Sequence, residues 1–186
     1  MFEELISRIT KELERAGLPY MIIGGQAVLF YGTVRMTKDI DITLGVDTAS
    51  LDAVVRAVKA IGAEIIPDDF EAFAEKTYVL PAIEKRSGIR IDFIFSFTPY
   101  ESQAIARAVP AILGGTRVMF AAVEDVIIHK VFAGRPRDLE DVRSLMIKNP
   151  VLDRRYVRKW LREFEKSSEK ATLLKTFEGV LNSINV

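Results

Sequence analysis

The spacing of apolar residues changes at about residue 122, and this change restricts the possible folds more than any other feature of the sequence. Before that point, short apolar or alternating runs predict strands, and apolar residues three and four positions apart predict helices. After it, only the helical spacing occurs. The chain is therefore expected to begin with a mixed α/β region and to end in a helical region.

The individual strands and helices follow from these patterns and from the glycines and prolines that separate them. Strands are expected over residues 20–23, 39–44, 77–83 and 89–95, with a hairpin over 111–120 that turns at Gly114-Gly115. Helices are expected over residues 2–16, 26–30, 50–61, 98–109, 123–133, 136–147, 153–166 and 169–181. The sequence thus predicts an α/β (α+β) fold, with a mixed sheet flanked by helices over residues 1–122 and an all-helical region over residues 123–186.

Length and composition suit a folded protein. The chain has 186 residues, of which 49% are hydrophobic and 28% are charged, so it has enough apolar surface for a core. Lys and Arg number 26, and Asp and Glu number 26, which gives a formal net charge of zero. Without an overall positive field, any site for nucleic acid must be a local basic patch.

Cysteine is absent and histidine occurs once, at His129. These two facts exclude disulfides, cysteine-ligated metals, thiol nucleophiles and zinc sites made of several histidines. The N-terminal segment is acidic and amphipathic, unlike a signal peptide, and no apolar run approaches the roughly 18 residues of a membrane span. The protein is expected to be cytoplasmic.

Two aspartates occupy alternate positions in the predicted strand 39–44. Residues two apart on a strand share a face, so Asp39 and Asp41 point the same way, about 7 Å apart, while Ile40 and Ile42 face the core. Neighbouring carboxylates repel each other, and a hard cation such as Mg²⁺ between them relieves the repulsion. The strand is therefore a candidate metal site.

Asp92 is a candidate for a third carboxylate, supplied by a neighbouring strand. Ile91 and Phe93 face inward in the predicted strand 89–95, so Asp92 shares the outward face with Arg90.

Gly24-Gly25 lies between a predicted strand and a predicted helix. Glycines let a phosphate approach the backbone closely, and a helix that begins there offers unpaired N–H groups. Neither of the commoner phosphate motifs, GxxxxGK[ST] or GxGxxG after a strand, occurs in the chain. Triphosphate and metal are expected to meet at this turn.

Two motifs resemble those of the DNA polymerase β-type nucleotidyltransferase superfamily. The first is Gly24-Gly25, a short helix and the strand Asp39-Ile40-Asp41, separated from the glycines by thirteen residues. The intervening segment 31–38, YGTVRMTK, resembles that of stand-alone prokaryotic members near the AbiEii-type toxins. The second is the segment 130–142, KVFAGRPRDLEDV, which resembles the K-x-x-A…R-D-x-x-D element of the same group.

This resemblance implies transfer of a nucleoside monophosphate from an NTP to an acceptor, with release of pyrophosphate. The acceptor is left open among tRNA, protein and small molecule, and a toxin–antitoxin partner protein is also possible. The resemblance implies that Gly24 and Gly25 bind the phosphates, and that Asp39, Asp41 and Asp92 bind two Mg²⁺ ions. It implies that Lys130 contacts the triphosphate and that Arg35 or Arg137 adds positive charge. Asp138 or Asp141 would orient Lys130 or the substrate.

Other interpretations of the same residues remain open. The chain could be a non-catalytic, antitoxin-like binding protein that keeps the fold, or the acidic strand could bind a regulatory cation or simply face solvent. Lys130, Arg137 and Asp138 could be ordinary charges on a helix surface. His129 lies about 100° around the helix from Lys130 and is not expected to be catalytic.

The predicted helix 153–166 carries a basic face. Its basic residues Arg155, Lys159, Arg162 and Lys166 lie away from an apolar stripe that includes Trp160. This face could hold an RNA backbone, or it could be a solvated surface of a helix that packs through Trp160.

Overall fold

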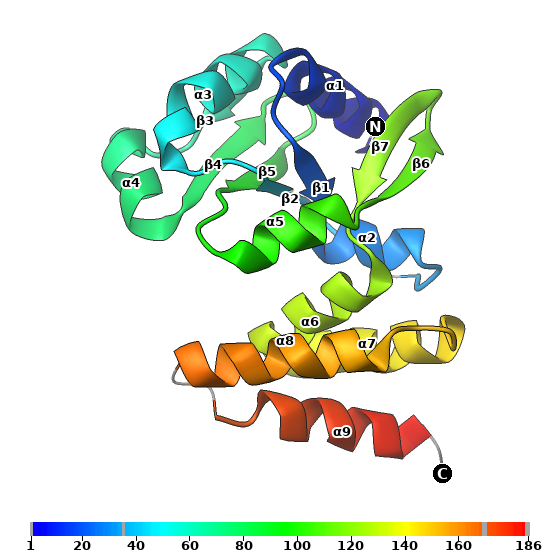
Figure 1. The fold of residues 1–186 in the computed structure, drawn as a ribbon. Helices are drawn as coiled ribbons and strands as arrows, with labels where there is room; N and C mark the ends of the chain where they lie inside the picture. The colour runs from blue at the N-terminus through cyan, green and yellow to red at the C-terminus, as the bar shows by residue number, and fades with distance from the viewer. Residues whose placement is uncertain (1, 35, 169–170, 185–186) are drawn as a thin grey trace. The chain divides into compact units, whose positions relative to one another are not determined.

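The computed structural model describes residues 2–34, 36–168 and 171–184, and within this part of the chain seven strands form one sheet (Figure 1). The strand order is β3-β4-β5-β2-β1-β7-β6. The strands are β1 (Tyr20–Ile22), β2 (Asp39–Leu44), β3 (Ala63–Ile65), β4 (Val79–Glu84), β5 (Ile89–Ile94), β6 (Val109–Leu113) and β7 (Thr116–Phe120). The sheet is mixed, because β2 runs parallel to β5 and β1 parallel to β7 while the other neighbours are antiparallel.

Helices make up most of the remaining described residues. They are α1 (Phe2–Arg15), α2 (Gly24–Phe30), α3 (Leu51–Ala60), α4 (Phe70–Thr77), α5 (Pro99–Ala106), α6 (Val123–Ala133), α7 (Pro136–Lys148), α8 (Arg154–Ser167) and α9 (Leu173–Ile184), with a short 3-10 helix, η1 (Thr48–Ser50). Across the described residues, no helix combines the length and the apolar character needed to cross a membrane.

The chain forms two compact units. The first contains residues 2–26 and 36–121 and includes the whole sheet. The second contains residues 27–34 together with the described residues from 122 onward.

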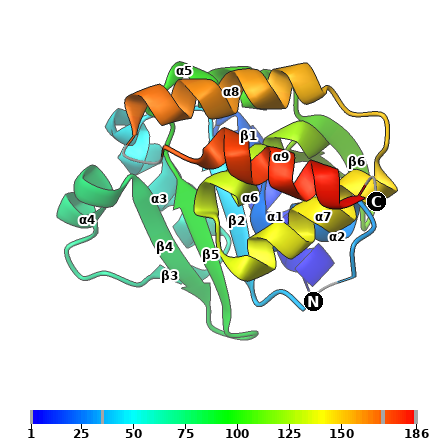
Figure 2. The same cartoon turned by 90° about the horizontal axis from the view of Figure 1, so that it is seen from below.

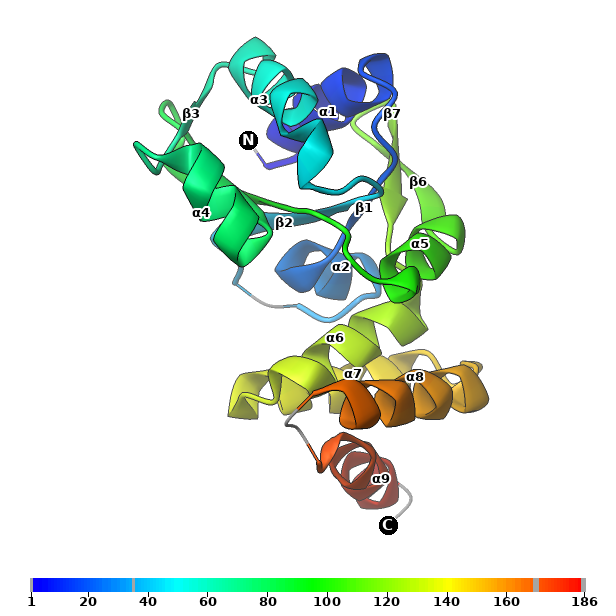
Figure 3. The ribbon, with the colours of Figure 1, turned by 60° about the vertical axis from the view of Figure 1, so that its left-hand side comes forward.

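In the first unit, α1 and α3 pack side by side (Figures 1 and 3). The apolar stripe of α1, which includes Leu5, Ile9 and Leu13, is buried, as the spacing of these residues predicts. Near the same helix, the hydroxyl groups of Ser7 and Thr116 share a hydrogen bond that links α1 to β7.

In the second unit, α6 contacts α7, α8 and α9 (Figure 2). α6 is buried on most of its surface, which explains its high content of Val and Ile. Two acidic side chains fasten its first turn to α8: the hydroxyl of Tyr156 donates to Asp125, over 2.9 Å, and the N–H of Asp153 donates to Glu124, over 2.9 Å. Buried carboxylates need such donors, because burial without them is costly.

The mixed sheet flanked by helices and the helical C-terminal region confirm the fold class predicted from the sequence. The prediction missed β3 and α4, and it began a strand at Thr77, which is the last residue of α4. Tyr78 ends α4 in the left-handed conformation, with a φ of 57°, so β4 begins only at Val79. Residues 169–170 of the predicted last helix lie outside the described residues, and α9 begins at Leu173.

Candidate active site

One face of the sheet gathers three carboxylates and one guanidinium at the pairing of β2 with β5. In this parallel register Asp39 is opposite Arg90, and Asp41 is opposite Asp92. The residues between them, Ile40 and Ile91, are fully buried on the other face. Asp39 is exposed and Asp41 and Asp92 are half-buried, so the acidic face is open to ligands. The structure therefore places all three predicted metal ligands on adjacent strands.

Gly24 lies directly against the carboxylate of Asp41. Its φ is +62°, a conformation that favours glycine, and a Cβ added there would overlap Asp41 Oδ2 and lie 2.8 Å from Asp41 Cγ. The N–H of Ile23 donates to the Asp41 carbonyl over 3.0 Å, which fixes the turn to β2. The glycine turn is therefore shaped around this aspartate, and Gly25, the next residue, is buried.

The third carboxylate is held by an ion pair that sequence reasoning did not assign. Arg90 Nε donates to Asp92 Oδ1 over 2.9 Å, and both residues belong to β5. The sequence signal was the two-residue spacing, which put Arg90 and Asp92 on one face, but nothing in the resemblance gave Arg90 a role.

The donor set fits a hard divalent cation. Asp39, Asp41 and Asp92 offer carboxylate oxygens from two adjacent strands, and these are ligands that Mg²⁺ prefers. Among the described residues, no three His, Cys, Asp or Glu side chains lie close enough together to hold a metal ion. Strand pairing thus puts the three carboxylates on one face, while the side chain of Asp92 contacts Arg90.

A second predicted cluster lies in the helical unit and centres on Lys130. Lys130 Nζ lies 2.8 Å from Asp138 Oδ1 and 3.0 Å from Asp141 Oδ2, so this α6 side chain bridges two carboxylates of α7. All three residues are buried. Sequence reasoning left open whether Asp138 or Asp141 orients Lys130, and both carboxylates contact it.

Asp138 has a second partner, Arg135, whose Nε lies 2.7 Å from Asp138 Oδ2. Burial alone would raise the pKa of Asp138, but the hydrogen bonds and charges of Lys130 and Arg135 outweigh burial and lower it below the ordinary value of 3.8. Asp138 is therefore a carboxylate at neutral pH. Arg137 is exposed on α7, and Arg35 lies outside the described residues.

The pKa of the one histidine in the sequence, His129, is strongly lowered. Burial of the His129 imidazole, helped by the adjacent positive charge of Lys130, lowers its pKa to about 4. His129 is therefore neutral at physiological pH, consistent with a packing role.

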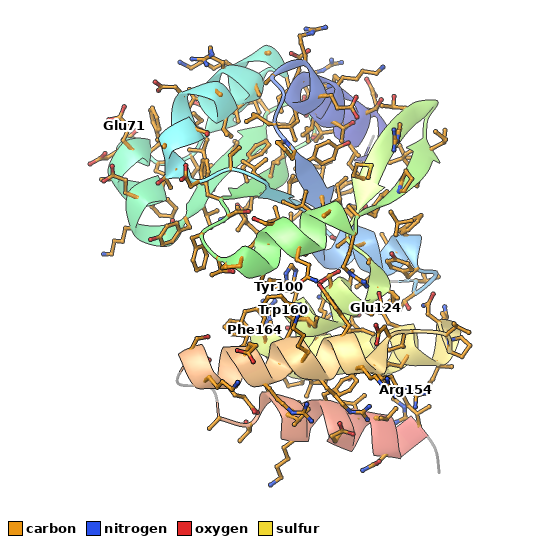
Figure 4. The ribbon with its side chains drawn as sticks, in the orientation of Figure 1. Glu71, Tyr100, Glu124, Arg154, Trp160 and Phe164 are labelled. Atoms are coloured by element: carbon orange, nitrogen blue, oxygen red, sulfur yellow. The ribbon has the colours of Figure 1, made fainter. Side chains whose placement is uncertain are left out.

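The predicted basic face is exposed on α8. Arg155, Lys159, Arg162 and Lys166 are all exposed, whereas Val157 and Leu161 of the apolar stripe are buried. Trp160 and Phe164 lie one turn apart on the same helix (Figure 4), with ring centroids 6.1 Å apart, and Phe164 packs edge-on against Phe132 of α6. The helix is thus held by its aromatic stripe and leaves its basic face open.

Solved nucleotidyltransferases share this fold. The solution structure of the antibiotic-resistance factor ANT(2'')-Ia is 18% identical, the match covers 98% of this chain and 94% of that chain, and the TM-score is 0.60. Lincomycin-bound LnuA, a lincosamide antibiotic adenylyltransferase, is 15% identical to this chain. The match covers 76% of this chain and 94% of that chain, with a TM-score of 0.54. A putative nucleotidyltransferase from H. pylori is 18% identical to this chain. The match covers 98% of this chain and 94% of that chain, with a TM-score of 0.52. The chain has the fold of the polymerase β-like nucleotidyltransferases.

The sequence comparison is more specific. Residues 17–183 match the family described as "Nucleotidyl transferase AbiEii toxin, Type IV TA system", and the chain belongs to this family of nucleotidyltransferases. No curated protein matches the chain.

Replacing Gly24 by alanine should both destabilise the protein and displace Asp41. The left-handed conformation alone costs an L-residue about 1–2 kcal/mol, and the overlap with Asp41 adds about 1–3 kcal/mol. Gly62→Ala is the matched control, because Gly62 has a φ of +74° but nothing within 4 Å of an added Cβ. Chemical denaturation of both variants measures the difference, and equal losses of stability would show that Gly24 is not packed against Asp41.

Lys130→Met should lower the free energy of unfolding by about 3–5 kcal/mol, because two buried carboxylates lose their shared cation. Lys166→Met is the control: Lys166 pairs with Glu163 over 2.9 Å, but both side chains are exposed, so its loss should cost less than about 1 kcal/mol. Urea unfolding at pH 7 tests both, and a cost of less than 1 kcal/mol at Lys130 would contradict the structural role of the pair.

The same variant should show a distinct pH dependence. Because the folded-state pKa of Asp138 is lowered, the stability that it contributes is fully present above its ordinary value of 3.8 and is lost as the pH falls through the lower folded value. The difference in the free energy of unfolding between wild type and Lys130→Met should therefore become smaller below about pH 4.

Proposed function

We propose that the protein transfers a nucleoside monophosphate from an NTP to an acceptor, with Mg²⁺ held on the acidic face of the sheet and pyrophosphate as the second product. The observation that carries this proposal is the register of β2 with β5, which aligns Asp39, Asp41 and Asp92 on one face, with Asp41 against the turn at Gly24. Membership of a nucleotidyltransferase family supports the same reaction.

Asp39, Asp41 and Asp92 would serve as the oxygen ligands of two Mg²⁺ ions. When bound, the metal supplies positive charge to the reacting α-phosphate and to the departing pyrophosphate. The three carboxylates themselves fix where that charge stands, because they project from paired strands rather than from loops.

Gly24 and Gly25 would receive the phosphates of the nucleotide. Neither residue has a side chain to keep a phosphate away from the backbone, and the left-handed turn at Gly24 starts α2 immediately beside Asp41. Arg35 and Arg137 are further candidates for phosphate contacts, as the resemblance implies.

Lys130 would add a donor for the triphosphate. An ammonium group has three N–H donors. In the described structure Lys130 pairs with Asp138 and Asp141, and a contact with the triphosphate would be made in addition to these ion pairs. Asp138 would thus act by orienting Lys130.

For the acceptor we propose an RNA held by the exposed basic face of α8. Support comes from the four basic residues of that face, which are all exposed. The toxin role named by the family description, with a partner protein that counteracts it, belongs to the same proposal.

Asp41→Asn should reduce transfer by at least about a hundredfold, because an amide is a poor replacement for a carboxylate that holds the metal. Labelling of a cell lysate with each α-labelled NTP, in the presence of Mg²⁺, measures transfer. Asp68→Asn, which removes an exposed carboxylate from a loop, is the control and should keep full activity.

Asp41→Asn should also fold at least as well as the wild type when metal is absent, because it relieves repulsion between carboxylates. A clearly lower melting temperature without metal would instead assign Asp41 a structural role, and unchanged transfer would remove it from the reaction.

RNA binding, if it uses the basic face of α8, should weaken steeply with salt. Four phosphate contacts predict a slope of about −3 to −4 in a plot of log affinity against log salt concentration. The double variant Arg155→Gln/Arg162→Gln should reduce the slope by about 2 while NTP affinity stays unchanged.

The matched control is Lys11→Gln/Arg15→Gln on α1, which removes the same charge from exposed positions of the other unit. It should leave the slope close to that of the wild type. Equal RNA binding by the two double variants would mean that the α8 face is only a solvated surface.

A further inference from the structure

Arg90 is the cation that the structure places within the acidic face. In the paired strands it lies opposite Asp39 and two residues before Asp92 on the same face. Its Nε contacts Asp92 Oδ1 over 2.9 Å, so the guanidinium offsets the repulsion among three neighbouring carboxylates.

The other neighbouring strand offers no competing charge at these positions. In the antiparallel register of β4 with β5, Pro81 is opposite Asp92 and Ile83 is opposite Arg90. Neither side chain can donate a hydrogen bond to a carboxylate. No side chain paired with these positions on β4 therefore competes with Arg90 for the carboxylate of Asp92.

The ion pair is one that can be broken. The Arg90 side chain is 51% exposed and the Asp92 side chain 22% exposed, and ion pairs this accessible to water contribute little free energy. A divalent cation carries twice the charge of a guanidinium and can bind carboxylates directly. The contact between Arg90 and Asp92 is thus strong enough to orient a side chain and weak enough to be exchanged.

We propose that Arg90 is a positioning residue that holds Asp92 in an ion pair until a divalent cation is bound, and then releases it to the metal. This inference rests on the proposed function, because it takes Asp92 as a ligand of that metal. Arg90 thereby serves as a resident counterion that stabilises the protein without metal and lowers its affinity for a single divalent cation.

Arg90→Gln should therefore raise the affinity for a divalent cation. The substitution removes both a competitor for Asp92 and a like charge next to the cation, and together these effects should tighten binding about threefold to tenfold. Arg90→Lys keeps the charge and should stay within about twofold of the wild type. Arg86→Gln is a further control, since Arg86 is exposed in the turn between β4 and β5 and has the same charge.

Mn²⁺ is a suitable probe, because electron paramagnetic resonance counts the free ion without any need for catalysis. The full chain is titrated with Mn²⁺ alone, as wild type, Arg90→Gln, Arg90→Lys, Arg86→Gln and Asp41→Asn. Tighter binding by Arg90→Gln than by Arg86→Gln supports the proposal. Equal affinities of wild type and Arg90→Gln overturn it, and if Asp41→Asn has lost binding in the same experiment, the proposed function survives.

Absence of Mn²⁺ binding in both wild type and Arg90→Gln would overturn the metal-dependent function together with this inference. Binding that appears only in Arg90→Gln would support both.

A measurement on the wild type covers the case in which the variants fold poorly. The ¹⁵N NMR signal of the Arg90 Nε–H reports its contact with Asp92, and it should shift as Mg²⁺ is added. A signal that stays unchanged at Mg²⁺ concentrations that occupy the site would overturn the proposal.

Discussion

The parallel pairing of β2 with β5 is the constraint on which the candidate site depends. Strand pairing fixes positions to within the spacing of a hydrogen-bonded ladder, so Asp41 and Asp92 become neighbours although fifty residues of sequence separate them. A register shift of one residue would turn the aspartates inward and expose Ile40 and Ile42. The buried isoleucines therefore hold the acidic face in register, and the free energy for grouping like charges comes from the apolar side of the same strands.

The two charged clusters use different environments for similar components. On the sheet, Arg90 and Asp92 are open to water, so their contact can be exchanged for a ligand. In the helical unit, Lys130, Asp138 and Asp141 are buried, so their contacts are costly to break. The exposed pair of Arg90 and Asp92 is thus suited to exchange partners, whereas the buried cluster around Lys130 is suited to keep its contacts. The same distinction explains why the proposed exchange of partners involves Arg90 and not Lys130.

Sequence patterns predicted most of the fold, and they placed Asp39, Asp41 and Asp92 on one face of neighbouring strands, where the structure also has them. The strict alternation in residues 39–44 and the helical spacing in 123–133 correspond to β2 and α6 with the same bounds. Patterns failed for β3, which has three residues, and for α4, where Ala74 is the buried residue and no apolar stripe forms. The contact of Gly24 with Asp41 could not be predicted, because it depends on the path of the turn in space. Nor could the partners of Lys130, because an exposed and a buried lysine have the same sequence signature.

The histidine offers a spectroscopic consequence. A chain with one histidine gives one pair of imidazole carbon-bound proton signals, and this residue precedes Lys130 in α6. Since its pKa is about 4, the ring carries no extra proton anywhere in the neutral range, and its chemical shift there is insensitive to small errors in pH. Any shift at neutral pH then reports a change in its surroundings, among them the charge on the neighbouring lysine. The protein thus contains a natural reporter for events at its buried charge cluster.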